Sequence, residues 1–262
     1  WRGMARFVSR LSTEYANICD QVIAPSESVA HLLKERGVET PITAIPTGIY
    51  PHQFAEGDGD AARAHHGIPR EALLVGHVGR LAPEKNVTLL AKALAAFLNK
   101  RPEAHALVVG EGPSSEEMRG CFAGAGVSDR LHMPGTLQGQ ALTDAYHAMD
   151  VFAFASQTET QGMVLAEAMT AGVPVVAVDA PGAREVVEDG RNGSLLTRCD
   201  PDAITDSLEA FASLSDAQRA ARSQAAKRTA ERFSMDRCTD RLIELYEHMR
   251  QLEPKTAGAQ DN

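Results

Sequence analysis

The sequence predicts an α/β fold, in which a parallel sheet carries helices on both faces and the carboxyl end is helical. Short apolar runs rich in β-branched residues alternate with stretches of helical periodicity, which is the pattern of a parallel sheet with crossover helices. The runs are apolar throughout, as is typical of strands buried on both faces. After Asp200 the strand-like runs stop and only helical patterns follow.

Each predicted strand ends near glycine, proline or serine, which are common turn residues. In chain order the strands are DQVIAP (20–25), PITAIP (41–46), LLVGHVG (73–79), HALVVGEG (105–112), RLHMPG (130–135), VFAFAS (151–156), PVVAVD (174–179) and GSLL (193–196). The predicted helices are 1–17, 26–37, 87–102, 114–126, 141–150, 162–172 and 183–190, then 202–214, 215–233 and 234–252. The glycine-rich segment 56–67, EGDGDAARAHHG, is interpreted as a flexible linker.

Composition excludes several classes of protein. The net charge of −9 argues against nucleic acid as a partner. No apolar run reaches the roughly 18 residues that a membrane-spanning helix needs. The four cysteines are far apart in the sequence and form no C-x-x-C pair, so we expect reduced thiols and a cytoplasmic location.

Ligands of open parallel sheets bind beyond the carboxyl ends of the strands, so the turns after strands are the candidate sites. One such turn carries Gly79, Arg80 and Lys85, two cations that suit a diphosphate. An ordinary solvated loop explains the same residues equally well. A second turn carries Gly110 and Glu111 in a G-x-G pattern, which is weak evidence because no third glycine follows at the required spacing.

A third turn places Glu159 after a strand and Glu167 eight positions later, inside a helix that begins near Gly162. The first N–H groups of that helix, those of residues 162–165, are expected to be free and to bind phosphate oxygens. The two carboxylates then lie on opposite sides of an anion site. This order of groups matches a ligand in which a diphosphate joins a sugar to a ribose. The alternative is that Glu159 caps the helix and Glu167 is solvated.

The ordered motifs GRLAPEKN (79–86), VVGEGP (108–113), MPG (133–135) and the two glutamates followed by AMTAGVPVVA (168–177) resemble the retaining glycosyltransferases of family 4. The resemblance covers about residues 21–249 and implies the GT-B fold of two facing Rossmann-like domains, this chain supplying the carboxyl-terminal one. It also implies transfer of a hexose from a nucleoside diphosphate sugar, with UDP-glucose as the expected donor, and no metal or other cofactor. The pair Asp58-x-Asp60, which is similar to a metal motif of another glycosyltransferase fold, is interpreted as part of the solvated linker.

The resemblance implies a role for each motif residue. Arg80 and Lys85 bind the diphosphate, Glu159 holds the transferred sugar near its reacting carbon, and these three are the expected catalytic residues. Glu167 is expected to bind the ribose hydroxyls. The remaining donor-binding residues are Gly79, Gly110, Glu111, Pro134, Gly135, Thr136 and Leu137, of which the last four face the base, and Gly162, Met163, Val164 and Leu165, which offer backbone N–H groups.

The expected domain organisation also follows from the resemblance. Residues 1–50 correspond to the last part of an acceptor-binding domain whose remainder is missing, and 51–235 to the donor-binding domain. Residues 236–252 form the helix that crosses back to the first domain, and 253–262 a disordered tail. The stretches TETQGMV (158–164) and IPTGI (45–49) are similar to bacterial members that glucosylate diacylglycerol. A lipid or glycolipid acceptor is therefore expected, with peripheral association at the inner membrane face through the missing domain.

Two other functions remain open at this point. One is a nucleotide-sugar binding subunit or fragment without catalytic activity of its own. The other is an NAD-dependent oxidoreductase, indicated by the α/β alternation and the VVGEGP turn. Against the oxidoreductase stand the absent third glycine and the lack of an acidic residue after the next predicted strand, which ends in Pro134 and Gly135.

Overall fold

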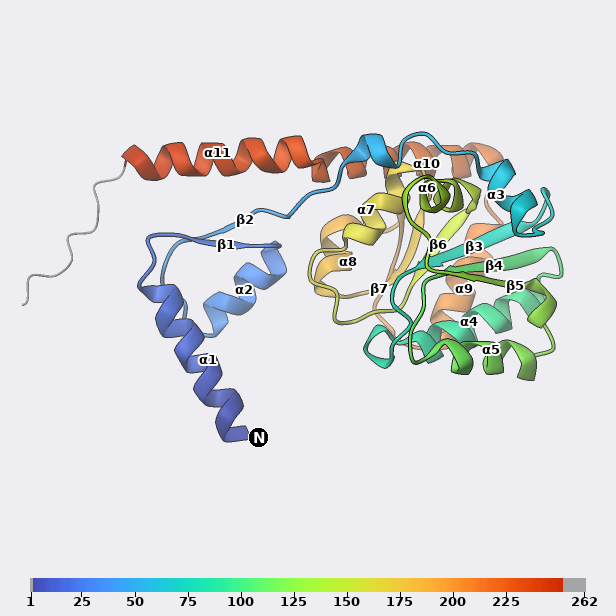
Figure 1. Cartoon of the computed structure of the whole chain (residues 1–262), viewed down its shortest axis with the longest axis horizontal. Helices are drawn as coiled ribbons and strands as arrows, with labels where there is room; N and C mark the ends of the chain where they lie inside the picture. Colours follow the sequence, from blue (N-terminus) through green and yellow to red (C-terminus); the bar gives the residue numbers. More distant parts are fainter. Residues whose placement is uncertain (1, 252–262) are drawn as a thin grey trace, which may run out of the picture. The chain divides into compact units, whose positions relative to one another are not determined.

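The computed structural model describes residues 2–251, and these residues form two compact units that we treat separately (Figure 1). The terminal unit combines the chain up to Gly48 with the residues from Met235 onward, and the sheet unit is Ile49–Ser234. Residues 253–262, for which a disordered tail is predicted, lie outside the described residues. No helix within residues 2–251 has both the length and the apolarity to cross a membrane.

The terminal unit contains a small sheet of its own. Strands β1 (Val22–Ala24) and β2 (Ile42–Ala44) pair in parallel with each other. The helices of this unit are α1 (Arg2–Asn17), α2 (Glu27–Glu35) and α11 (Met235–Gln251). The hydroxyl of Ser26 accepts a hydrogen bond from the N–H of Val29 at 3.2 Å, so it caps the start of α2. Large apolar side chains of α1, such as Phe7 and Leu11, are exposed in this chain, and so is Ile18 just after the helix.

The sheet unit is built on six parallel strands in the order β5-β4-β3-β6-β7-β8. The strands are β3 (Leu73–Val78), β4 (Ala104–Val109), β5 (Leu131–Gly135), β6 (Val151–Phe154), β7 (Val175–Val178) and β8 (Gly193–Leu196). The central strand β3 pairs with β4 on one side and with β6 on the other, so that Val75 lies between Ala106 and Val151. The predicted parallel α/β sheet is confirmed.

Helices cover both faces of this sheet (Figure 1). They are α3 (Gly59–His65), α4 (Val87–Lys100), α5 (Ser115–Gly124), α6 (Gly139–Ala148), α7 (Met163–Thr170), α8 (Pro181–Val186), α9 (Pro201–Ala212) and α10 (Asp216–Ala230). Alternate strand residues enter different cores: Leu74 packs in the core with α6 and α7, and Val75 packs in the core with α4, α5 and α9. Burial on both faces explains why the strands are apolar throughout.

The predicted linker 56–67 is ordered, which corrects the sequence-based interpretation. It contains α3, whose first turn is capped by Asp58 through a 2.8 Å bond from the N–H of Ala61. Asp60, the other member of the acidic pair, lies 2.9 Å from Arg70. The buried guanidinium of Arg63 donates to the carbonyl of Ala148 at 2.7 Å. The segment therefore holds α6 against the sheet instead of connecting two domains freely.

Candidate active site

The predicted site residues follow the carboxyl ends of four neighbouring strands. From β3 the chain continues towards β4 and β5, whereas from β6 it continues towards β7 and β8, so the order reverses between β3 and β6. Crevices at such reversal points are the usual ligand sites of open α/β sheets. Gly79 and Arg80 follow β3 directly, and Glu159 follows β6 after a short loop.

The turn after β3 carries both predicted cations. Arg80 donates to the carboxylate of Glu84 four residues later, and its side chain is largely exposed. Lys85 ends a short 3₁₀ turn and is less exposed. The next residue, Asn86, has a left-handed backbone with φ of 54°, and its amide donates to the carbonyl of Ala155 at 3.0 Å. Asn86 thus ties the turn after β3 to the end of β6, a role that the sequence interpretation missed.

Glu159 is held by groups from both sides of the crevice. Its Oε2 lies 3.2 Å from the Nζ of Lys85, and its Oε1 accepts the N–H of Gly162 at 3.2 Å and that of Gln161 at 3.4 Å. Burial opposes ionisation of this carboxyl, but the N–H of Gly162 and the ammonium of Lys85 outweigh burial and lower its pKa. Glu159 therefore carries a negative charge at neutral pH.

The start of α7 differs in detail from the prediction. We expected four free N–H groups at residues 162–165, and two of them have acceptors. The N–H of Gly162 donates to Glu159, and that of Leu165 donates to the carbonyl of Gly162 at 3.0 Å. Met163 and Val164 occupy the first two positions of the helix, where an N–H has no acceptor within its own helix. The start of α7 therefore offers fewer free N–H groups to a possible anion than the four that we predicted.

Glu167 lies in α7 one turn after Met163, and it has a partner that the sequence did not reveal. The hydroxyl of Tyr146, a buried residue of α6, donates to its Oε2 at 2.8 Å. Burial raises the pKa of Glu167, and the hydrogen bond from Tyr146 opposes this only in part. Burial and the neighbouring carboxylate raise the pKa of the Tyr146 phenol well above its usual value. The alternative of a solvated Glu167 is wrong.

Two further turns complete the same edge of the sheet. Gly110 has φ of 125° and its N–H donates to the carbonyl of Gly135 at 2.8 Å, which joins the ends of β4 and β5. A β-carbon at Gly135 would lie 2.7 Å from the Oε1 of Glu111, so this glycine makes room for that carboxylate. Pro134 lies in β5, Thr136 is exposed just after it, and Leu137 packs against the core.

A buried histidine also lies at this edge and was not predicted. His77 of β3 has its Nδ1 3.0 Å from the carbonyl oxygen of Ala153, and its Nε2 is buried without a hydrogen-bond partner. Burial lowers the pKa of His77 to about 4, so its ring is neutral at physiological pH. Its signal in the sequence is a lone polar residue inside an apolar strand, which is also the signal of an ordinary core histidine.

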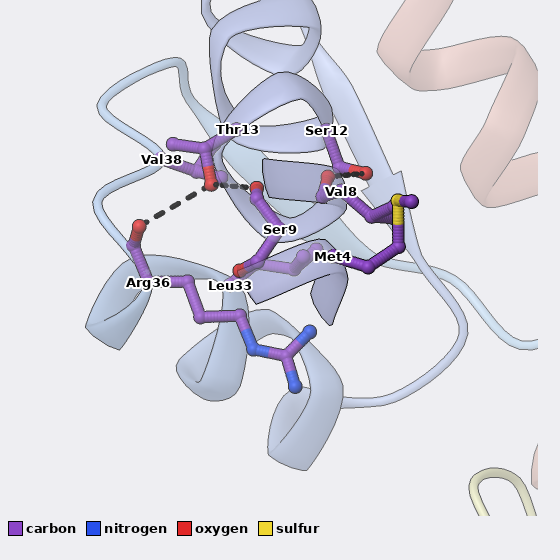
Figure 2. A pocket seen from close by; sticks show the side chains of 8 residues that line it. All are labelled: Met4, Val8, Ser9, Ser12, Thr13, Leu33, Arg36 and Val38. Atoms are coloured by element: carbon purple, nitrogen blue, oxygen red, sulfur yellow. Dashed lines mark hydrogen bonds between the residues drawn. The ribbon is translucent and has the colours of Figure 1, made fainter. Parts of the chain in front are cut away.

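The terminal unit has a separate hollow of about 510 Å³ between α1 and α2 (Figure 2). Its lining is mainly apolar and includes Met4, Val8, Leu33 and Val38, and Arg36 also lines it. Figure 2 shows the guanidinium of Arg36 pointing away from the hydroxyl groups of the lining. None of the predicted site residues lines this hollow. Within residues 2–251 no three histidine, cysteine, aspartate or glutamate side chains are grouped as metal ligands would be.

Comparison with known families identifies the sheet unit. The family model described as "Glycosyl transferases group 1" matches residues 58–229, which is most of the chain. The chain belongs to this family. This assignment agrees with the predicted resemblance, and it sets aside the oxidoreductase alternative.

Related proteins support the same assignment. The chain is 32% identical over 239 residues to a D-inositol 3-phosphate glycosyltransferase of Stackebrandtia nassauensis, covering 87% of this chain and 54% of that protein. It is 38% identical over 135 residues to the sulfoquinovosyl transferase SQD2 of Arabidopsis thaliana, covering 50% of this chain and 24% of that one. The chain thus spans about half the length of the first of these relatives.

Solved structures agree with the GT-B fold. Anabaena Alr3699/HepE in complex with UDP and glucose is 26% identical, with a TM-score of 0.79 over 91% of this chain and 66% of that one. Sucrose-phosphate synthase from Thermosynechococcus elongatus, at 22% identity and a TM-score of 0.77 over 92% of this chain and 61% of that one, shows the same fold. The expected fold is confirmed, while the roles of individual residues remain predictions.

Proposed function

We propose that this glycosyltransferase binds a nucleoside diphosphate sugar, with UDP-glucose as the donor, over the carboxyl edge of the six-stranded sheet. The observation that carries the proposal is the convergence of the Lys85 ammonium, the Glu159 carboxylate and the start of α7 between β3 and β6. A cation beside a helix N-terminus favours phosphate, and an adjacent ionised carboxylate favours hydroxyl groups.

Each motif residue then has a role in the proposed complex. Lys85 and Arg80 neutralise the diphosphate, for which Arg80 exchanges Glu84 for phosphate oxygens. The N–H groups of Met163 and Val164 add hydrogen bonds from the helix. Glu159 orients the sugar and Glu167 accepts hydrogen bonds from the ribose hydroxyls. The turns that carry Gly110, Glu111 and residues 134–137 border the nucleotide base.

The proposed reaction transfers a hexose with retention of its configuration. The acceptor hydroxyl attacks the anomeric carbon from the face that the diphosphate leaves, so the bond to phosphate breaks as the bond to the acceptor oxygen forms. The departing diphosphate takes the proton of that hydroxyl. Arg80 and Lys85 stabilise the charge that develops on the leaving group, which is the largest contribution that a metal-free site of this kind offers.

We further propose that the chain supplies the donor-binding half of a larger enzyme, because it covers about half of a related glycosyltransferase. In this proposal residues 1–50 and the helix 236–252 belong with the acceptor domain. We propose a lipid or glycolipid acceptor, reached at the inner membrane face, on the strength of the TETQGMV and IPTGI stretches. The relative from Stackebrandtia nassauensis is named instead for D-inositol 3-phosphate. Offering diacylglycerol and inositol 3-phosphate to the intact enzyme with UDP-glucose distinguishes the two.

Calorimetric titration with UDP in the presence of excess EDTA tests the proposed function. We expect binding that is unchanged by EDTA, because side chains and helix N–H groups neutralise the diphosphate. The variant Asp60→Ala, which alters the acidic pair of α3, should bind UDP as the wild type does. Loss of UDP binding in EDTA, with circular dichroism unchanged, would contradict the proposal. A chain that binds UDP-glucose but never hydrolyses or transfers glucose would be a binding subunit.

A further inference from the structure

Gly182 occupies the first turn of α8, just after β7, at a position that does not require a glycine backbone. It is not among the glycines with positive φ. A glycine within a helix is less favourable than alanine. The reason for a glycine at this position must therefore be sought in the contacts that a β-carbon would make.

The three nearest of those contacts are with the loop that carries Glu159. A β-carbon at position 182 would lie 2.5 Å from the nitrogen of Gln161, 2.7 Å from that of Gly162 and 2.8 Å from the Cγ of Glu159. The close approach is mutual, since a β-carbon at Gly162 would collide with the carbonyl oxygen of Gly182. The N–H of Gly182 also donates to the carbonyl of Glu159 at 2.8 Å.

The atoms that a methyl group at position 182 would displace are also the atoms that aim the Glu159 carboxylate. The N–H groups of Gln161 and Gly162 are the two backbone donors to its Oε1. The first turn of α8 is itself anchored, because Arg184 donates to both carboxylate oxygens of Asp179, at 2.8 and 3.0 Å. The turn therefore acts as a fixed support behind the Glu159 loop.

We infer that Gly182 is a positioning residue for the donor sugar, acting through Glu159 and not through the diphosphate. This inference rests on the proposed function, in which Glu159 contacts the sugar. The backbone contact between Gly182 and Gly162 sets where the Glu159 carboxylate lies, and so sets the fit of the transferred sugar. A β-carbon at position 182 would come nearest to Gln161, Gly162 and Glu159 and not to Lys85 or Arg80, so we expect the diphosphate to keep both of its proposed cations.

The variant Gly182→Ala tests the inference through the affinities for UDP and UDP-glucose, measured by calorimetry on the whole chain. Any extra affinity of the wild type for UDP-glucose over UDP should be lost, while the affinity for UDP itself changes by less than about threefold. Transfer or hydrolysis of the donor should fall by about 100-fold, as misplacement of a positioning group by about 1 Å can do. Gly120→Ala in α5, where a β-carbon meets nothing within 4 Å, is the matched control and should behave as the wild type.

A double-mutant cycle separates action through Glu159 from general damage. In a Glu159→Ala background, Gly182→Ala should have no further effect on the affinity for UDP-glucose. Additive effects would overturn the inference, as would a Gly182→Ala chain that keeps the wild-type preference for UDP-glucose. If Gly182→Ala does not fold, Val186→Ala takes its place, because the Cγ2 of Val186 supports Gly162 from the same helix and its removal should loosen the same loop. A wild-type chain that does not bind UDP would instead overturn the proposed function.

Discussion

Glu159 and Glu167 lie eight residues apart and have opposite electrostatic environments. The N–H of Gly162 and the ammonium of Lys85 lower the pKa of Glu159 against the effect of burial, whereas burial raises the pKa of Glu167. Their spacing was readable from the sequence. Their partners were not, because Lys85 and Tyr146 are 74 and 21 residues distant and meet the glutamates only through the fold.

His77 gives a prediction about stability and pH. Its native pKa of about 4 lies below the ordinary value of 6.5 because the ring is buried. In that interval the unfolded chain binds a proton that the native chain does not, so stability falls as pH falls from 6.5 towards 4. From pH 7.5 to pH 5 this one group should cost the fold about 2 kcal/mol.

Urea unfolding at these two pH values, for the wild type and for His77→Phe, measures this effect. Phenylalanine suits the site because the ring of His77 stacks with that of Phe152 and lies at a tilt to that of Phe154. Other histidines with lowered pKa values add to the slope in both proteins, so the difference between the two slopes is the informative quantity. Equal slopes would show that His77 is not held neutral by the fold.

At the level of elements, the strands of the sheet unit were predictable because continuous apolar runs suit strands buried on both faces. The run LLVGHVG matches β3. The run VTLLAKALAAFLNKRP matches α4, although the observed helix ends two residues before the predicted end. Helix α3 was missed because Gly57 precedes it, Gly59 is its first residue, and its stability comes from tertiary contacts such as those of the buried Arg63. A sequence pattern indicates periodicity, whereas contacts of this kind depend on the completed fold.

The turn between β3 and α4 carries a prediction of its own. Replacing Lys85 with alanine removes the ammonium group that pairs with Glu159, so binding of UDP should weaken by about 1.5–3 kcal/mol, the usual contribution of a charged hydrogen bond. Uridine, which lacks phosphate, should bind the variant as it binds the wild type. Lys92→Ala, at an exposed position of α4, is the matched control. A loss of affinity that is equal for uridine and UDP would assign Lys85 to the nucleoside instead of the diphosphate.

At the scale of the whole molecule, every predicted site residue lies between Gly79 and Glu167 and thus within the sheet unit. The protein carries a net charge of −9, so local cations and helix N–H groups would have to attract the proposed anionic donor. The fold class and the strand-end position of the site followed from the sequence, because topology alone brings the carboxyl ends of parallel strands to one edge. The sequence did not show which N–H groups at the start of α7 have acceptors, because this depends on the conformation of the loop that carries Glu159.

The most direct test of this account is the affinity of UDP and of UDP-glucose for Glu159→Ala and Glu167→Ala, measured by calorimetry against the wild type. Glu167→Ala should weaken the binding of both ligands by the same amount, about 1.5–3 kcal/mol, because the proposed partner of Glu167 is the ribose that they share. Glu159→Ala should leave the affinity for UDP nearly unchanged and lower the affinity for UDP-glucose. Glu117→Ala, on the exposed face of α5, should change neither. Equal losses of UDP affinity in the Glu159 and Glu167 variants would contradict the division of roles between the two carboxylates.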